Sequence, residues 1–401
     1  MAKRILFVHY GSDWIRGSEK CLLDQIKYVA RLGYYPIVWT NNPSLAKQVE
    51  MMSLRCQLDE FPLLLGWSKP RLDLSAWSGL VKKATVMLHK LNVDLIHVNS
   101  GAPCQWMIPA SRATGTPLVT QLHCPYTARD RMTLGIHLSP HVITVSRYVA
   151  RTLLRDGFDK RRLSVIHNGI DVTALETQPE VNVREELGLA ADDFLFATVG
   201  SLIHRKGIDR VITSLRHVVL EYPNTKLVVI GDGPQRDHLE QQCDYLHLQD
   251  HVHFVGEQSH VVGWLKGCDA FISGARSEAF GLVVAEAAIA QIPVVAPYEG
   301  GIPEFVQHGK TGVLYVNQGY GPMANAMRNV INSEALRDSL VANAYQHITE
   351  HYDTSVACAN VERVYRKLIK QKQPKKVGVL RTLLPIKTAI SNRLSFGGQH
   401  G

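Results

Sequence analysis

Ser277-Glu-Ala-Phe-Gly-Leu-Val-Val-Ala-Glu286 is the stretch that decides the fold of this chain. The apolar residues 269–273 before it predict a buried strand, and residues 283–290 predict a helix. A glycine turn between them leaves the N–H groups of the first helical turn free to bind an anion. Carboxylates at Glu278 and Glu286 would repel a phosphate there, so we expect them to hold hydroxyl groups beside it. The stretch predicts a nucleotide-sugar site.

Outward from this stretch, short apolar runs alternate with longer amphipathic segments in both halves of the chain. Fully apolar strands separated by helices are typical of parallel sheets that are covered on both faces. The sequence therefore predicts an α/β fold of two doubly wound, Rossmann-like domains, whose ligand binds at the carboxyl ends of the strands in a cleft between the sheets. The predicted strands are 4–9, 36–39, 94–98, 117–122, 142–145, 194–199, 226–230, 251–255, 270–272 and 293–296. The predicted helices are 19–32, 75–91, 102–113, 208–221, 235–247, 283–290, 322–332, 334–350 and 355–370.

The domain boundary is expected in the polar stretch 174–182, which contains Pro179 and has no periodic pattern. Residues 1–178 are predicted to form an N-terminal acceptor-binding domain, and residues 179–355 a C-terminal domain for the nucleotide-sugar. A C-terminal helix at 356–372 and a basic tail at 373–401 complete the expected organisation.

Composition predicts a soluble globular protein, with 45% hydrophobic and 20% charged residues. No apolar run approaches the ~20 residues of a membrane helix, and the first apolar run is too short for a signal peptide. Seven cysteines are scattered without metal-like spacing, which is typical of reduced thiols in a cytoplasmic protein. These features predict a cytoplasmic protein, and peripheral contact with the inner face of the cell membrane is one of two interpretations of its basic tail.

The net charge of +8 comes from the end of the chain. Ten Lys/Arg and no Asp/Glu lie between Arg363 and Gly401, which leaves 34 basic against 36 acidic residues elsewhere. The body is thus not basic enough to predict a nucleic-acid groove. The tail mixes basic and aliphatic residues, and two interpretations stay open for it: contact with an anionic membrane surface, or a solvated tail.

Three more strand ends carry candidate binding residues. Gly17 and Ser18 open a helix after the first strand, where a phosphate or sugar would meet the backbone. Arg205 and Lys206 follow a strand of the second half and would supply cations to a diphosphate. His123 ends another strand and would hydrogen-bond a sugar or phosphate. An ordinary strand-to-helix loop, an exposed charged turn and a structural histidine are the alternatives for these three places.

Taken together, these residues resemble the GT-B glycosyltransferases, and among them the retaining family 4, also called glycosyl transferases group 1. The resemblance covers roughly residues 3–370. It is carried by the two glutamates of the opening stretch, and by the order of the motifs along the chain. These motifs are Gly17-Ser-Glu19, Asn168-Gly-Ile-Asp171, Arg205-Lys-Gly207, Gly231-Asp-Gly-Pro234 and Gly300-Gly-Ile-Pro-Glu304.

The resemblance implies a role for each site residue. Arg205 and Lys206 would hold the donor diphosphate. Glu286 would bind the ribose hydroxyls, and Glu278 the hydroxyls of the donor sugar, where His123 would also make contact. Further donor-binding roles fall to Gly17, Ser18 and the backbone of Phe280, Gly281 and Leu282. The chain departs from the family where Ser201 replaces a frequent arginine, and where Ser18 replaces the second glycine of a Gly-Gly pair.

The implied reaction is transfer of a hexose, with retention, from a UDP-sugar or alternatively GDP-mannose. The acceptor would be a saccharide or lipid-linked saccharide in polysaccharide or glycolipid assembly. No metal or other cofactor is expected, because the cations of the chain would stabilise the leaving diphosphate. The alternatives are a non-catalytic nucleotide-sugar-binding protein, and an epimerase or phosphorylase on the same scaffold. A dehydrogenase is disfavoured, because no G-x-G-x-x-G motif opens either half.

Overall fold

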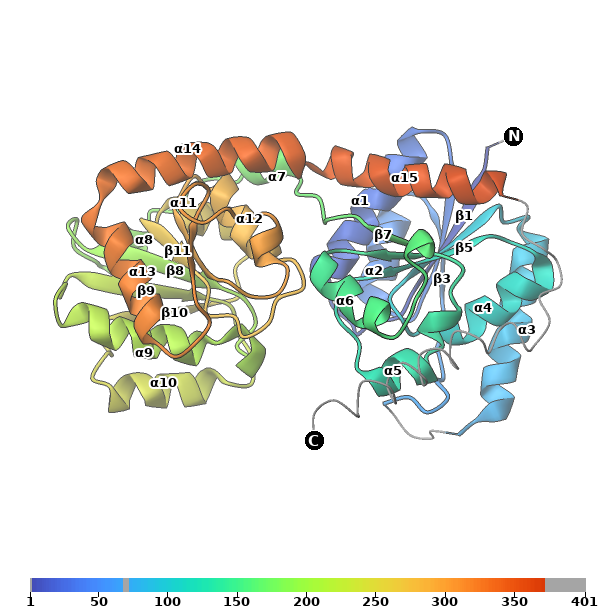
Figure 1. Ribbon diagram of the computed structural model, residues 1–401, viewed down its shortest axis with the longest axis horizontal. Helices are drawn as coiled ribbons and strands as arrows, with labels where there is room; N and C mark the ends of the chain where they lie inside the picture. Colours follow the sequence, from blue (N-terminus) through green and yellow to red (C-terminus); the bar gives the residue numbers. More distant parts are fainter. Residues whose placement is uncertain (1, 68–71, 372–401) are drawn as a thin grey trace. The chain divides into compact units, whose positions relative to one another are not determined.

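A computed structural model describes residues 2–67 and 72–371 of the chain. The chain divides into two compact units, one running from the N-terminus to Gly169 and resuming at Ser355, the other from Ile170 to Thr354 (Figure 1). Each unit has its own parallel sheet with helices packed against it. The prediction of two doubly wound α/β domains is thus confirmed.

The N-terminal unit is built on a seven-stranded parallel sheet in the order β3-β2-β1-β4-β5-β6-β7. The order reverses direction at β1, as in doubly wound sheets whose ligands bind at the strand ends. Its strands are β1 (Arg4–His9), β2 (Tyr35–Thr40), β3 (Arg55–Leu58), β4 (Leu95–Asn99), β5 (Leu118–Leu122), β6 (Val142–Thr144) and β7 (Leu163–Val165). Its helices are α1 (Gly17–Arg31), α2 (Pro43–Met51), α3 (Leu74–Lys90), α4 (Cys104–Thr114), α5 (Ala128–Thr133) and α6 (Arg147–Arg155), with 3₁₀ turns η1 (Ile136–Leu138) and η2 (Lys160–Arg162).

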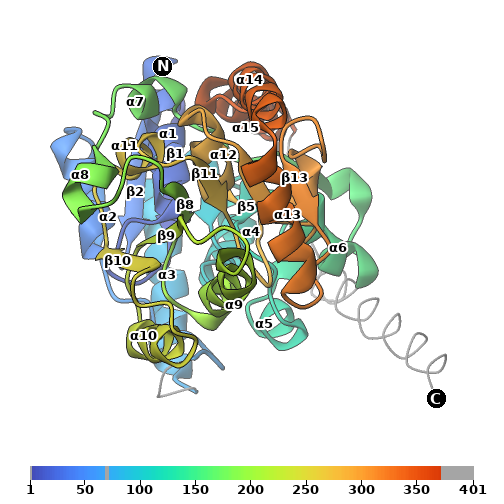
Figure 2. The same cartoon turned by 90° about the vertical axis from the view of Figure 1, so that its left-hand side faces the viewer.

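The C-terminal unit has a six-stranded parallel sheet in the order β10-β9-β8-β11-β12-β13. Figure 2 views this unit with α10 and α9 at its lower edge. Its strands are β8 (Phe194–Val199), β9 (Thr225–Ile230), β10 (Val252–Gly256), β11 (Ala270–Ile272), β12 (Val294–Pro297) and β13 (Val313–Tyr315). Its helices are α7 (Val172–Glu176), α8 (Val183–Leu187), α9 (Ile208–Val219), α10 (Arg236–Tyr245), α11 (Val261–Lys266), α12 (Leu282–Ile289), α13 (Gly321–Asn332) and α14 (Glu334–His351), with η3 (His204–Lys206) and η4 (Ile302–Glu304).

The last described helix, α15 (Thr354–Lys370), returns the chain to the N-terminal unit, where Figure 1 shows it beside α1. Its apolar face joins the core formed by β1, β4 and α1, in which Val361, Tyr365 and Leu368 are buried. The Tyr365 hydroxyl shares a 2.6 Å hydrogen bond with Nδ1 of buried His97. At the edge of the same contact, Tyr34 donates to the Glu362 carboxylate. The N-terminal unit is therefore completed by residues far away in the sequence.

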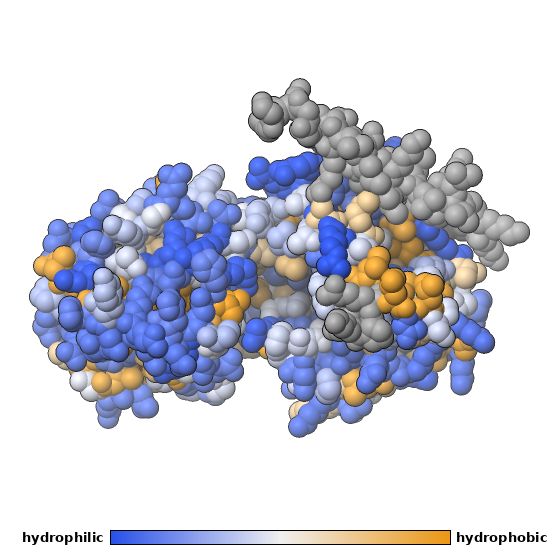
Figure 3. Space-filling view, turned by 90° about the horizontal axis from the view of Figure 1, so that it is seen from below, coloured by the Kyte–Doolittle hydropathy of each residue, from blue (hydrophilic) through white to orange (hydrophobic). Residues whose placement is uncertain are grey.

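Several large apolar side chains of the N-terminal unit lie exposed in the stretch from the end of β3 to the start of α3. Figure 3 shows hydrophobic residues gathered on one face of this unit. The exposed residues of this stretch are Leu58, Leu65, Trp67, Leu72 and Leu74. None of the described helices is long and apolar enough to cross a membrane. The predicted tail 373–401 lies outside the described residues.

Candidate active site

In the C-terminal unit, the loop after β8 delivers two cations to the carboxyl end of the sheet. Its 3₁₀ turn, η3, contains Arg205 and Lys206 and stops at Gly207, whose φ of 65° favours glycine. A Cβ at Gly207 would lie 2.0 Å from the carbonyl oxygen of Gly274, just beyond β11. Only glycine therefore allows the two loops to pack this closely, and the close packing brings Arg205 and Lys206 next to Glu278.

Glu278 is held by both cations. Its Oε2 atom lies 2.6 Å from Nζ of Lys206 and 3.4 Å from Nη1 of Arg205. Its Oε1 atom accepts a longer hydrogen bond, 3.3 Å, from the backbone N–H of Ala279. Burial raises the pKa of Glu278, but Lys206 and Arg205 outweigh burial and hold the pKa below its ordinary value. The carboxylate is therefore ionised at neutral pH and accepts hydrogen bonds only.

Helix α12 begins directly after this carboxylate. Gly281 is its N-cap and no side chain caps it, so the first-turn N–H groups of this helix lack the usual side-chain partner. The Phe280 side chain is buried and stacks on Phe305 at 4.7 Å between ring centroids. Phe280 can therefore offer only its backbone to a ligand. Glu286 lies one turn into the helix and is part exposed, on the same face as Leu282 and Val283.

Gly300 and Gly301 pack against the backbone of Glu278. Gly301 donates its N–H to the carbonyl oxygen of Glu278 at 2.9 Å. Gly300 has a φ of 64°, and a Cβ there would lie 2.0 Å from the same carbonyl oxygen. The close approach of the two backbones therefore depends on glycine at position 300.

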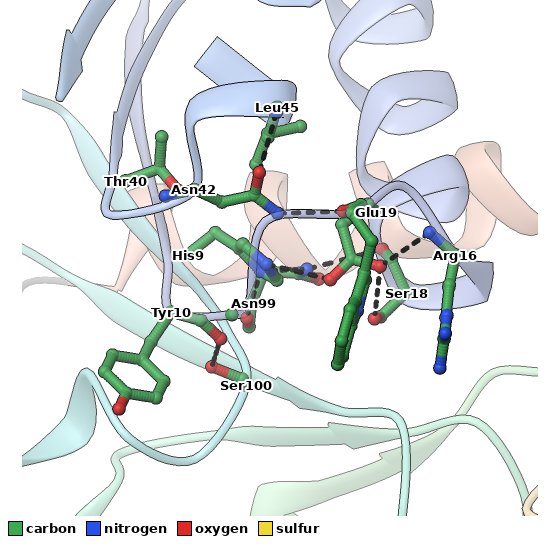
Figure 4. Close-up of polar contacts among 12 residues, drawn as sticks. His9, Tyr10, Arg16, Ser18, Glu19, Thr40, Asn42, Leu45, Asn99 and Ser100 are labelled. Atoms are coloured by element: carbon green, nitrogen blue, oxygen red, sulfur yellow. Dashed lines mark hydrogen bonds and ion pairs between the residues drawn. The ribbon is translucent and has the colours of Figure 1, made fainter. Parts of the chain in front are cut away.

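In the N-terminal unit, the loop after β1 leads into α1 with a buried acidic residue in its first turn (Figure 4). Oε2 of Glu19 accepts hydrogen bonds from the Arg16 N–H and the Ser18 hydroxyl, each 3.0 Å long. Oε1 of Glu19 lies 3.0 Å from Nε2 of His9, and both side chains are buried. Gly17 and Ser18 are thus fixed at the start of the helix.

His123, just beyond β5, belongs to the same cluster. Its Nε2 atom lies 2.7 Å from Oδ1 of Asn99, the last residue of β4. Burial lowers the pKa of His123 to about 4, so the ring is neutral at pH 7. The amide nitrogen of Asn99 lies 3.4 Å from the Ser18 carbonyl oxygen, which links His123 to the glycine loop.

The structure thus groups the predicted residues into two sets. Arg205, Lys206 and Glu278 meet in the C-terminal unit beside the helix that carries Glu286, whereas His123 and Ser18 meet in the N-terminal unit. Sequence reasoning gave no role to His9, Glu19 or Asn99. One signal was available, because His9 and Asn99 are polar residues at the last position of strands made mostly of apolar residues. Over residues 2–67 and 72–371, no group of three or more His, Cys, Asp or Glu is arranged to hold a metal.

Comparison with known proteins identifies the chain. The family model "Glycosyltransferase Family 4" matches residues 15–174, and "Glycosyl transferases group 1" matches residues 180–347. N-acetyl-alpha-D-glucosaminyl L-malate synthase of Bacillus anthracis is 23% identical over 77% of this chain and 82% of its own length. Glycogen synthase of Mycobacterium tuberculosis is 27% identical over 73% and 76%. The solved structure of Anabaena Alr3699/HepE in complex with UDP has a TM-score of 0.78 at 24% identity, over 91% of this chain and 100% of that one.

Fold and sequence together define a glycosyltransferase of the GT-B class. The chain belongs to the glycosyl transferases of group 1. The prediction of a glycosyltransferase that takes its sugar from a nucleotide-sugar is thereby confirmed at this level. The particular donor, the acceptor, the stereochemical outcome and the role of each site residue are taken up as proposals below.

Proposed function

We propose that the protein is a retaining hexosyltransferase that uses a nucleotide diphosphate sugar, preferably a UDP-sugar. The observation that carries this proposal is the contact between Lys206 and Glu278 at the start of α12. A cation suited to a diphosphate lies here beside a carboxylate suited to sugar hydroxyls, next to free helical N–H groups. The complex of the Anabaena protein with UDP supports UDP as the nucleotide.

Each side chain receives a role from its position. Lys206 and Arg205 bind the diphosphate, assisted by the N–H groups of Gly281 and Leu282. Glu278, released from its cation partners, accepts hydrogen bonds from the hydroxyls of the donor hexose. Glu286, one turn further along α12, accepts them from the ribose.

In the reaction, the bond between the anomeric carbon and the diphosphate oxygen breaks, and its electron pair stays on the phosphate. The acceptor oxygen forms the new bond to the anomeric carbon, on the face that the diphosphate leaves. The proton of the acceptor hydroxyl passes to an oxygen of the departing phosphate. Lys206 and Arg205 stabilise the negative charge as it develops, and this stabilisation lowers the barrier.

Retention could also arise from a covalent intermediate on a carboxylate. Glu278 is poorly suited to this role, because its oxygens pass from Lys206 and Arg205 to the hydroxyls of the sugar when the donor binds. We therefore assign to Glu278 the orientation of the sugar. With two cations fixed by the chain, we expect the diphosphate to need no divalent metal, so that turnover in EDTA equals turnover in Mg²⁺.

The acceptor is proposed to be a saccharide or lipid-linked saccharide in polysaccharide or glycolipid assembly. The exposed apolar side chains between β3 and α3 favour the lipid-linked form, since they offer the N-terminal unit an apolar surface beside its polar one. Peripheral contact of residues 373–401 with an anionic membrane at the cytoplasmic face belongs to the same proposal.

The experiment is a donor and acceptor screen. The purified protein is incubated with radiolabelled UDP-glucose, UDP-N-acetylglucosamine or GDP-mannose, with and without a membrane lipid extract, and the anomeric configuration of the product is read by NMR. We expect transfer from a UDP-sugar with retention. An inverted product would refute the mechanism. Binding of UDP in calorimetry without any transfer would favour a nucleotide-sugar-binding protein instead.

A further inference from the structure

The buried cluster that contains Glu19 points to a function for residues that have no assigned role. Glu19 and His9 are almost completely buried, with 3% and 1% of their surface exposed. Burying a carboxylate is unfavourable unless hydrogen bonds and an opposite charge stabilise it. Glu19 has three such contacts, to the Arg16 N–H, the Ser18 hydroxyl and the His9 ring. A helix start on the surface needs no such arrangement, because a solvated Glu can cap it equally well.

The His9 ring connects Glu19 to Asn99. While Nε2 of His9 faces Glu19, Nδ1 lies 2.9 Å from the Asn99 carbonyl oxygen and 3.0 Å from the Asn99 amide nitrogen. Figure 4 shows Glu19, His9 and Asn99 next to one another, with dashed lines marking these contacts. The position of His9 therefore determines where the Asn99 side chain lies.

The Asn99 amide in turn fixes the proton on His123. A nearby carbonyl identifies which end of the amide is nitrogen, because the Ser18 carbonyl oxygen can only accept a hydrogen bond. The amide oxygen consequently faces Nε2 of His123 at 2.7 Å. An oxygen acceptor at that distance requires a proton on Nε2, so in the neutral ring Nδ1 carries the lone pair.

Nδ1 of His123 is also the atom of this ring that has no hydrogen-bond partner among the described residues, and it is shielded from solvent. Leaving a buried acceptor unpaired costs about 1–3 kcal/mol. Such a group in a folded protein calls for an explanation, and a ligand that supplies the missing donor is one. A phosphate oxygen at neutral pH has no proton to offer, whereas a sugar hydroxyl has.

We propose that Glu19, acting through His9 and Asn99, is a positioning residue that keeps the His123 proton on Nε2 and so presents Nδ1 to a hydroxyl of the sugar. This inference rests on the proposed function, in which His123 contacts the donor sugar. The structure thereby separates two roles for the histidine. It accepts a hydrogen bond from a hydroxyl, and it does not provide a positive charge for the diphosphate.

The first test locates the His123 proton in the wild-type chain. The full chain is labelled with ¹⁵N-histidine, and long-range ¹H–¹⁵N spectra at pH 7 report which ring nitrogen carries the proton. A His123→Gln sample identifies the His123 signals. We expect a neutral ring with Nε2 protonated. A proton on Nδ1, or a charged ring, would overturn the proposal whether or not the protein transfers sugar.

The second test removes the charge of Glu19. In Glu19→Gln, we expect His123 to show a mixture of the two neutral forms and kcat to fall roughly 10-fold or more. The Kd for UDP should stay within about twofold, because the nucleotide is held by the other unit. Glu50→Gln, an exposed acid on α2, is the matched control and should change neither quantity. An unchanged His123 spectrum in Glu19→Gln would contradict the proposal that Glu19 acts on His123 through His9 and Asn99.

A second pair of variants keeps the test decisive if Glu19→Gln does not fold. Asn99→Asp preserves an oxygen acceptor for Nε2 of His123, whereas Asn99→Leu removes it. We expect the protonated Nε2 to persist in the first and to be lost in the second, and the same spectrum in both would refute the proposal. Absence of sugar transfer in the wild-type protein is a separate result, which would refute the proposed function and leave the proton position measurable.

Discussion

Nζ of Lys206 lies 2.6 Å from Oε2 of Glu278, so the cation proposed for the diphosphate and the carboxylate proposed for the sugar neutralise each other in the ligand-free chain. The pair is largely shielded, with 19% and 14% of the side-chain surfaces exposed. Removing the partner of a shielded charge without replacing it is strongly unfavourable. Donor binding must therefore exchange partners, with phosphate replacing the carboxylate on Lys206 and hydroxyls replacing the ammonium on Glu278.

Replacing Lys206 by alanine tests this exchange. Because the ammonium meets charge that develops during the reaction, Lys206→Ala should lower kcat by roughly 10²-fold or more. Steady-state kinetics with the preferred donor measures this loss. Lys310→Ala removes an exposed lysine of the same unit and should leave kcat unchanged. Equal kcat in wild type and Lys206→Ala would remove Lys206 from the chemistry.

Gly300 offers a matched pair of glycine variants. Gly300 and Gly309 both have left-handed backbone, with φ of 64° and 74°, but a Cβ at 300 meets the Glu278 carbonyl oxygen at 2.0 Å and one at 309 meets nothing within 4 Å. Both alanine variants carry a conformational cost of about 1–2 kcal/mol. In Gly300→Ala the Glu278 backbone must also move, by about 1 Å, and a shift of that size lowers turnover by roughly 10²-fold.

Turnover and thermal unfolding are measured for both glycine variants. We expect the larger loss of stability in Gly300→Ala, where the backbone clash adds to the shared conformational cost, and a loss of turnover in Gly300→Ala alone. If Gly309→Ala loses as much turnover as Gly300→Ala, strain alone explains the effect, and the contact with Glu278 is not needed.

Glu19 predicts a pH-dependent contribution to stability. Burial raises the pKa of Glu19, but the His9 contact and the hydrogen bonds at the carboxylate bring it down to about 2. A depressed pKa in the folded state stabilises the fold fully above the ordinary glutamate value, and this contribution disappears as the pH falls through the folded-state pKa. The shift corresponds to at most about 3 kcal/mol.

Urea unfolding of wild type and Glu19→Gln between pH 7 and pH 2 measures this contribution. Wild type should be more stable by roughly 2–3 kcal/mol at pH 7, and the difference should shrink from about pH 5 towards pH 2. The Glu50→Gln control should show a small difference that varies little with pH. A difference for Glu19→Gln that does not depend on pH would mean that packing, rather than charge, stabilises this position.

The sequence predicted the central strands well because most of their residues are apolar. Strands β1, β4 and β8 are buried on both faces, and their runs of Val, Ile, Leu and Phe mark them clearly. The strands that were missed, β3, β7 and β13, are all at sheet edges. An edge strand has one neighbour and less cover, so β3 reads Arg-Cys-Gln-Leu and is only half-buried. Its sequence is not that of a core strand.

The candidate site was predictable where function lies in a local motif. Lys206 and Glu278 each follow a strand and precede a helix, and that context can be recognised without coordinates. Their contact, 72 residues apart in the sequence, could not be recognised. The contact between His9 and Asn99 could not be recognised either. It arises because β1 and β4 pair in the sheet, and neither segment alone indicates that pairing. The packing of α15 on the N-terminal unit is also a tertiary result.

That packing gives the last prediction, which concerns Tyr365. Its hydroxyl is buried and shares a hydrogen bond with Nδ1 of His97, whose pKa is lowered by burial to about 3, so that the ring is neutral at pH 7. Tyr365→Phe leaves this ring nitrogen unpaired inside the protein, at a cost of about 1–3 kcal/mol. Tyr345 on α14 donates to Glu176 at the surface, where water can replace the lost partner, so Tyr345→Phe should cost less than about 0.5 kcal/mol. Urea unfolding of the two variants gives both values. Equal losses would show that α15 is held by its apolar face alone, without help from the buried hydrogen bond.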